Sequence, residues 1–257
     1  MTGKRFEGRH VLISGGAAGV GGEASRLFAA EGAKVTIVDI LGQVGRDLAA
    51  ELTKSGAPAL MIEADVSSED AVTAAIRQAA EHFGPVDVLH NHAGTTIVKP
   101  FHETTTVEWK RLFDINVHSM FFMTRAVIPG MLKKGKGVVV NTSSVSAILA
   151  TPMEVAYCST KGACHVFTKA IATEYRDQNI RCNAVCPGFI RTGHGLREID
   201  ALRGYGVNVS ETDIIDMQGR ICEPVEIARA VLFLASEDAS FINGETLFVD
   251  NGLSVRT

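Results

Sequence analysis

Short apolar runs recur along the whole chain and limit the folds that it can adopt. They lie at residues 11–13, 35–38, 59–62, 86–89, 138–140, 182–185 and 247–249. Between most of them, apolar residues repeat with the period of an α-helix, as at Ala71, Ala75, Ile76 and Ala79. This alternation is typical of βαβ units. We therefore predict an α/β fold with a doubly wound parallel sheet of about seven strands and helices on both of its faces.

The first apolar run is followed by a glycine-rich turn at residues 14–21 and then by a helix-like stretch at 23–31. Gly15 permits a tight turn, Gly19 lets backbone N–H groups approach a pyrophosphate, and Gly21 lets the helix start close to the strand. The spacing is Gly-x-x-x-Gly-x-Gly, and such a turn can also be a plain loop. Its position after the first strand nevertheless predicts a dinucleotide site.

Tyr157 and Lys161 are four residues apart in a stretch that reads as a helix, with Ser144 upstream. Residues at this spacing project from one helix face, so the Lys161 ammonium is expected beside the Tyr157 phenol. A neighbouring cation favours the ionised phenol, so we expect it to lower the pKa of Tyr157 toward the neutral range that a general acid or base requires. Alone, this pair also occurs by chance on exposed helices.

The order of these motifs resembles that of the short-chain dehydrogenase/reductase family, in its single-domain, NAD(P)-dependent oxidoreductase branch, nearly end to end. Further landmarks are Asp65-Val66, Asn91-His92-Ala93-Gly94, Asn116, Pro187-Gly188 with Thr192, and a closing Asn243-Gly244 to Val249-Asp250. The resemblance implies a Rossmann-type fold. It also implies a homotetramer, assembled through the helices near 109–134 and 155–178 and through the C-terminal strand.

The same resemblance assigns the catalytic roles. Tyr157 is expected to be the acid/base, Ser144 to hydrogen-bond the substrate oxygen, Lys161 to anchor the ribose and Asn116 to organise a relay. Ser143 is the main rival of Ser144, whose hydroxyl could instead satisfy a strand-end backbone group. Asn116 could be no more than a tolerated mid-helix residue.

Asp39 ends the second apolar run and predicts NAD as the cofactor. Its carboxylate can accept hydrogen bonds from the ribose hydroxyls and would repel a 2′-phosphate, although it could also cap the next helix. By resemblance, Asp65 and Val66 frame the adenine; Asp65 could also cap a helix at 68–83. The full expected cofactor site comprises Gly15, Ala18, Gly19, Val20, Gly21, Asp39, Ile40, Asp65, Val66, Asn91, Ala93, Gly94, Tyr157, Lys161, Pro187, Gly188, Ile190 and Thr192.

Three departures from the family pattern are visible. His92 replaces an asparagine common in the family, Asn251 replaces a glycine, and Ser14 replaces a threonine. Since His90 and His92 alternate at a strand end, we expect them to face opposite sides of the sheet and to be structural.

Composition fits a single domain over residues 1–257. The chain is 46% hydrophobic with a net charge of −4, and no basic stripe points to nucleic acid or to a membrane surface. We therefore expect a small-molecule partner. The N-terminus lacks the apolar core of a signal peptide, and the five cysteines include no Cys-x-x-Cys pair, so we expect reduced thiols, a cytoplasmic location and no metal site.

A glycine-rich segment at 193–219 follows the sixth run, and we expect it to be a mobile substrate lid rather than an ordered surface excursion. The leading hypothesis is an NAD-dependent dehydrogenase that acts on a secondary alcohol or its ketone. The apolar stretch 145–150 with Met153 favours a medium-sized apolar, cyclic or aromatic substrate. The alternatives are an NADP-dependent carbonyl reductase and a non-catalytic dinucleotide sensor.

Overall fold

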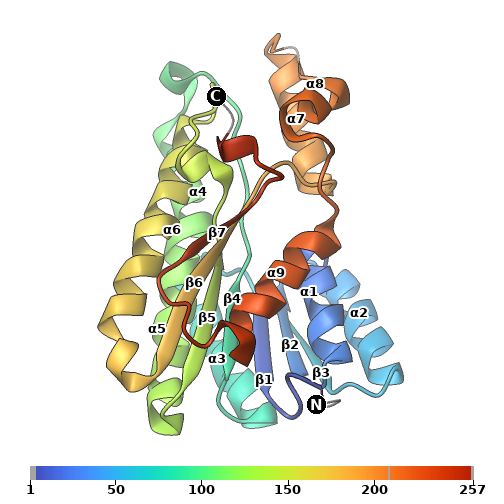
Figure 1. Ribbon diagram of the computed structural model, residues 1–257, viewed down its shortest axis with the longest axis vertical. Helices are drawn as coiled ribbons and strands as arrows, with labels where there is room; N and C mark the ends of the chain where they lie inside the picture. Colours follow the sequence, from blue (N-terminus) through green and yellow to red (C-terminus); the bar gives the residue numbers. More distant parts are fainter. Residues whose placement is uncertain (1–3, 208, 256–257) are drawn as a thin grey trace.

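The computed structural model describes residues 4–207 and 209–255 and contains one parallel sheet flanked by helices (Figure 1). Its strands pair in the order β3-β2-β1-β4-β5-β6-β7, all in parallel. Their bounds are β1 His10–Ser14, β2 Lys34–Asp39, β3 Ala59–Glu63, β4 Val88–Asn91, β5 Gly137–Thr142, β6 Ile180–Pro187 and β7 Thr246–Val249. The predicted fold class is confirmed, and each of the seven apolar runs contributes a strand.

The helices connect successive strands. They are α1 Gly19–Ala30, α2 Gly42–Lys54, α3 Glu69–Phe83, α4 Thr106–Phe113, α5 Ser119–Lys134, α6 Val155–Glu174, α7 Gly193–Gly204, α8 Glu211–Gln218 and α9 Pro224–Ala235. Short turns are η1 Phe101–Glu103, η3 Val145–Ala147, η4 Arg176–Gln178, η5 Glu237–Ala239 and η6 Leu253–Val255, and η2 Asp114–His118 is a π-helical turn. Within the described part of the chain, no helix is long and apolar enough to span a membrane.

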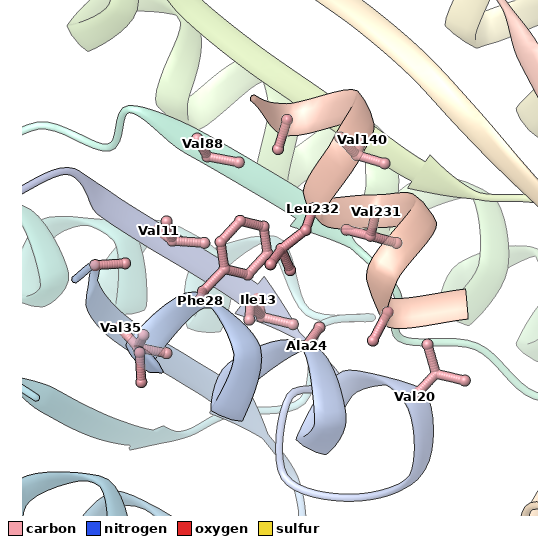
Figure 2. Packing of buried hydrophobic residues seen from close by; sticks show 14 of the residues in the cluster. Val11, Ile13, Val20, Ala24, Phe28, Val35, Val88, Val140, Val231 and Leu232 are labelled. Carbon is pink, nitrogen blue, oxygen red and sulfur yellow. The ribbon is translucent and has the colours of Figure 1, made fainter. Parts of the chain in front are cut away.

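Two hydrophobic cores hold the layers together, one on each face of the sheet. On one face, Phe28 of α1 lies fully buried among residues of β1, β4 and α9, including Leu232 (Figure 2). On the other face, α3 and α5 pack through residues such as Val72 and Met123. Burial of an aromatic or branched side chain contributes about 1.5–3 kcal/mol, so these two cores fix the helices against the sheet.

The strand order reverses between β1 and β4, which makes this the switch point where such sheets bind ligands. The Ser14 hydroxyl accepts hydrogen bonds from the backbone N–H groups of His92 (3.1 Å) and Ala93 (3.3 Å). A serine therefore ties the ends of the two strands together across the switch point.

The segment that we predicted as a lid forms α7 and α8, which lie beyond the carboxyl end of β6 (Figure 1); position 208 within it lies outside the described residues. Its base is held by the buried Gln218. The amide oxygen of Gln218 accepts from Phe189 N at 2.8 Å, and its amide nitrogen donates to Phe189 O at 3.0 Å. The connection between β6 and this segment is therefore fixed at its root.

Candidate active site

The four predicted catalytic residues come from three neighbouring elements at the carboxyl end of the sheet. Tyr157 and Lys161 lie on α6, Ser144 follows β5, and Asn116 lies in the π-helical turn η2 between α4 and α5. All four are nearly buried, with exposed fractions between 7% and 9%. The α6 residues can reach the end of β5 because α6 packs along the sheet beside β6.

Ser144, rather than Ser143, faces the tyrosine. The Ser144 hydroxyl lies in hydrogen-bonding reach of the Tyr157 phenol and also accepts from Ser146 N at 3.1 Å, so it caps a backbone turn as well. The Ser143 hydroxyl instead donates to the backbone oxygen of Lys161 at 3.2 Å. Two hydroxyl groups, those of Ser144 and Tyr157, can therefore converge on one oxygen atom of a ligand.

Lys161 lies beside the tyrosine as the helical spacing predicts, with its ammonium nitrogen 5.5 Å from the centre of the Tyr157 ring. That nitrogen donates to the backbone oxygen of Thr142 at 2.9 Å. We expected Lys161 to lower the pKa of Tyr157. That prediction is wrong for this structure, because the pKa of Tyr157 is raised above its ordinary value. Burial is the largest cause, and the carboxyl groups of Glu198 and Glu154 add to it, whereas the Ser144 hydrogen bond acts in the opposite direction.

The side-chain amide of Asn116 makes three hydrogen bonds that join two segments of the chain. Its side-chain oxygen accepts from Thr95 N, and its nitrogen donates to Thr95 O, both at 2.8 Å, and to the Thr160 hydroxyl at 3.0 Å. A Cβ added at Gly94 would lie 3.4 Å from the Asn116 oxygen and 3.8 Å from the Lys161 nitrogen. Asn116 therefore joins the loop after β4 to α6, next to Gly94, at a π-helical turn of the kind found at functional sites.

His90 and His92 do not face opposite sides of the sheet as predicted. Side chains two positions apart along a strand lie on the same face, so the expectation misapplied the strand period; β4 itself ends at Asn91, one residue before His92. Both rings contact the Thr142 hydroxyl, at 3.0 Å and 3.1 Å, and their centres are 5.3 Å apart. Burial, together with the charge of Lys161, lowers the pKa of His92 to about 3, so this ring is neutral at physiological pH.

The glycine turn has the geometry of a phosphate cradle. Gly15 has a φ of +68°, and a Cβ added at Gly21 would lie 2.0 Å from the Gly15 backbone oxygen, so only glycine fits there. The helix begins at Gly19, earlier than the predicted 23–31. No side chain caps it at Ala18, and its first turn carries no acidic residue. The positive end of the helix dipole is thus open to an anionic group, which fits a pyrophosphate.

Asp39 lies buried at the end of β2, beside this turn. One carboxylate oxygen accepts from Ala17 N and the other from Leu41 N, each at 3.0 Å. The side chain does not cap α2, whose cap position is Leu41. Each carboxylate oxygen can accept a further hydrogen bond, so Asp39 retains capacity for ribose hydroxyls.

The other predicted cofactor residues differ in what they can offer. Thr192 lies opposite the glycine turn, because a Cβ at Gly19 would lie 3.5 Å from its methyl carbon, and its hydroxyl caps α7. Val66 is buried in the core and Ile40 is exposed. Val20 belongs to the core on one face of the sheet, and Ala93 packs against the core on the other face. Ala18 lies in the turn after β1, Pro187 is the last residue of β6, and Gly188 and Ile190 follow it.

Two polar residues of the predicted cofactor site make contacts within the protein, and one alternative for them is wrong. Asp65 does not cap α3, because that helix begins at Glu69 and its cap is Ser68. The Asp65 carboxylate instead accepts from the N–H and the hydroxyl of Ser67 and forms an ion pair with Arg111 at 3.2 Å. The Asn91 side chain is turned inward, where its nitrogen donates to Asn141 at 2.9 Å. The role of Asn91 in cofactor binding stays a prediction.

Three residues that our sequence analysis missed also border the site. Glu154 precedes α6 by one position and is only 1% exposed, and Glu198 and His194 lie on α7. The Glu154 and Glu198 carboxyl groups are in hydrogen-bonding reach of each other and both act on the pKa of Tyr157. The spacing of Glu154 and Tyr157 on one helix face could have indicated the first of them.

The comparisons with known proteins agree with this geometry. The sequence profile of the family described as "Enoyl-(Acyl carrier protein) reductase" matches residues 15–254. Cyclopentanol dehydrogenase of Comamonas sp. (strain NCIMB 9872) is 39% identical to this chain over 248 residues, covering 96% of this chain and 98% of that protein. The 2,5-dichloro-2,5-cyclohexadiene-1,4-diol dehydrogenase LinX of Sphingobium indicum is 36% identical over 251 residues, 98% of each chain.

The fold agrees equally well with a solved structure. The crystal structure of levodione reductase matches with a TM-score of 0.92 and 33% identity, covering 98% of this chain and all of that one. Relatives of this kind act on alcohols and are named as dehydrogenases, so the protein is an oxidoreductase. On this evidence the chain belongs to the short-chain dehydrogenase/reductase family.

Proposed function

We propose that this protein is an NAD-dependent dehydrogenase that transfers a hydride between a secondary alcohol, or its ketone, and the nicotinamide. The observation that carries the proposal is the convergence of the Ser144 and Tyr157 hydroxyl groups beside Lys161, at the switch point that also holds the glycine turn. A dinucleotide sensor would need the turn but not the paired hydroxyl groups.

The reaction needs a proton to move at the substrate oxygen. In the reducing direction the Tyr157 phenol, which its raised pKa keeps protonated, donates its proton to the carbonyl oxygen. In the oxidising direction the phenol first loses its proton to solvent, and the resulting phenolate removes the hydroxyl proton. Ser144 donates a second hydrogen bond to the same oxygen and stabilises the charge that develops there. Asn116 holds the loop at Thr95 against α6, which keeps the site in shape.

The cofactor site fits a nicotinamide dinucleotide through the open N-terminus of α1, Asp39 and Lys161. Asp39 would accept hydrogen bonds from the adenosine ribose and disfavour a 2′-phosphate, which makes NAD the cofactor. Lys161 would hold the nicotinamide ribose from its position on the Thr142 oxygen. When bound, the nicotinamide supplies the hydride acceptor or donor.

The substrate is a medium-sized apolar alcohol, cyclic or aromatic. Apolar side chains follow Ser144, and Ile148 is 54% exposed at the edge of the site, where it can cover a ring. The segment 193–219 closes over this ring as a lid. The names of the cyclopentanol dehydrogenase and of LinX, both of which act on cyclic alcohols, support a cyclic substrate.

The test is turnover of a panel of aliphatic, cyclic, aromatic, steroid and polyol alcohols with NAD, and with NADP in parallel, followed by the absorbance of the reduced nicotinamide. We expect cyclic alcohols with NAD to give the highest kcat/KM. A preference for NADP would identify a carbonyl reductase instead. Binding of NAD without turnover of any alcohol or ketone would favour a sensor.

The assembly is a homotetramer that acts in the cytoplasm. Exposed apolar side chains on the helices that the family uses for assembly support this, since Phe121 of α5 is 42% exposed and Val166 of α6 is 67% exposed. The five cysteines are free thiols, which suits a reducing compartment. Sedimentation of the purified protein as a monomer would contradict the tetramer.

A further inference from the structure

Two carboxyl groups meet at the edge of the active site, one from each side of the entrance. Glu154 lies one helical turn before Tyr157, and Glu198 reaches toward it from α7 in the lid. Glutamate is almost never fully buried without a partner, yet Glu154 is 1% exposed and the Glu198 side chain 14%. A buried pair of like charges is costly, so these positions call for a reason beyond stability.

The chain leaves Glu154 with unused hydrogen-bonding capacity. The Glu154 Oε1 accepts from the Thr96 hydroxyl at 3.5 Å, and the Thr151 side chain is also in hydrogen-bonding reach of the carboxyl group, while Oε2 is buried and has no close donor within the described ranges 4–207 and 209–255. Two carboxyl groups in contact can hydrogen-bond only when one of them is protonated. Consistent with this, burial and mutual repulsion raise the pKa of Glu154, and burial raises that of Glu198.

The nearby basic groups do not neutralise the pair. The ring nitrogen of His194 lies 3.8 Å from Glu198, but burial and the charge of Lys161 lower the pKa of His194 to about 4, so the ring is neutral at physiological pH. The Lys161 ammonium is committed to the Thr142 oxygen. Neither His194 nor Lys161 therefore neutralises the two carboxyl groups.

The backbone before the pair is held in an unusual conformation. Met153, the residue preceding Glu154, has a φ of +66°, which side-chain-bearing residues rarely adopt, and its carbonyl oxygen accepts from Lys99 N at 2.8 Å. Such conformations cost about 1–3 kcal/mol and are concentrated at functional sites. Glu154 is thus placed beside Tyr157 by a turn in which Met153 adopts a disfavoured backbone conformation.

From this geometry we infer that Glu154 and Glu198 bind a second hydroxyl group of the substrate, so that the enzyme prefers diols to the corresponding simple alcohols. A hydroxyl both donates and accepts, which matches a carboxyl pair that holds one proton and keeps a free oxygen. Tyr157 and Ser144 would hold the reacting oxygen, and the pair would hold the other one, about a helical turn away. This inference rests on the proposed dehydrogenase function and names its substrate class.

The experiment compares cyclohexanol with cis- and trans-1,2-, 1,3- and 1,4-cyclohexanediol in the wild type and in Glu154→Gln and Glu198→Gln. We expect at least one diol to exceed cyclohexanol about tenfold or more in kcat/KM, as the loss of one hydrogen bond to a charged group implies. In either variant the ratio of kcat/KM for that diol to kcat/KM for cyclohexanol, each taken at the pH optimum of the variant, should fall about tenfold through a rise in KM for the diol. Asp200→Asn, an exposed position on the same helix, is the matched control.

Three results would overturn the inference. The first is a wild type that uses no diol better than cyclohexanol. The second is an equal loss of activity on both substrates in the variants, which would indicate a purely structural pair. A cyclic amino alcohol that surpassed every diol would instead identify an ammonium site.

Binding of the same ligands, measured by calorimetry, decides the matter without turnover. If no alcohol reacts, the proposed function fails, but tighter binding of a diol that Glu154→Gln weakens would still support the inference. Equal binding of diol and cyclohexanol would refute it.

Discussion

The Lys161 ammonium donates a hydrogen bond to the backbone oxygen of Thr142 at 2.9 Å, at the end of β5. The hydroxyl of the same threonine contacts both His90 and His92. Thr142 therefore links the cation of the active site to the loop after β4 that borders the switch point. The charge of Lys161 is fixed in place before any ligand arrives, which reduces the reorganisation that catalysis would otherwise require.

Replacement of Asp39 should change cofactor choice. In Asp39→Ala, the ratio of kcat/KM for NAD to that for NADP should fall about tenfold or more, because a charged acceptor for the ribose hydroxyls is lost together with the repulsion of a 2′-phosphate. Initial rates with both nicotinamides give this ratio directly. Asp47→Ala, an exposed carboxylate on α2, should leave it unchanged. An unaltered ratio in Asp39→Ala would show that another feature selects the cofactor.

Loss of Asn116 should weaken the fold as well as the site. Asn116→Ala leaves the N–H and C=O of Thr95 without their partners, so the free energy of unfolding should drop by about 1–3 kcal/mol. Denaturant unfolding measures the change. Asp114→Ala, an exposed residue of the same π-helical turn, should cost no more than about 0.5 kcal/mol. A similar effect of the two substitutions would mean that the clamp at Thr95 contributes little.

The buried carboxyl pair should make the protein less stable at high pH. Because the pKa values of Glu154 and Glu198 are raised above the ordinary 4.5, their neutral forms favour the folded state at and below that pH. This contribution is lost as the pH rises through the raised values. Glu154→Gln should therefore flatten the decline in unfolding free energy between pH 5.5 and pH 8.5. If wild type and variant decline in parallel, the pair is ionised in both states.

The carboxylate of Glu198 on α7 should also affect the pH dependence of kcat/KM. The negative charge of Glu198 contributes to the raised pKa of Tyr157, after burial, so its removal should lower that pKa. In Glu198→Gln the rise of cyclohexanol oxidation with pH should shift to lower pH. The measurement is a profile of kcat/KM against pH, with Asp200→Asn as the control. A shift in the opposite direction would show that Glu198 does not act on the phenol.

Sequence reasoning located the sheet because parallel strands are buried on both faces and read as continuous apolar runs. It placed the start of α1 too late, because Gly19, Gly21 and Gly22 have low helix propensity, whereas the close approach of Gly21 to the Gly15 backbone requires glycine there. It misplaced His92 because residues two positions apart on a strand lie on the same face of the sheet, not on opposite faces.

The raised pKa of Tyr157 and the contribution of α7 to the site could not be predicted from local spacing. The i,i+4 rule correctly placed Lys161 beside the phenol, but burial and the charge of Glu198, a residue of α7, determine the direction of the shift. Glu154 and Glu198 meet only because α7 lies next to the start of α6. Such a contact depends on tertiary packing that no sequence pattern in this chain encodes.

The most direct test of the account is the turnover of a cyclic alcohol by Tyr157→Phe compared with the wild type, together with the affinity of both for NAD. We expect kcat to fall by about 10²- to 10⁴-fold while the NAD dissociation constant changes little, because the phenol moves the proton but Asp39 and α1 hold the cofactor. Tyr175→Phe, just beyond the end of α6, should behave as the wild type. Undiminished turnover in Tyr157→Phe would contradict the proposed mechanism.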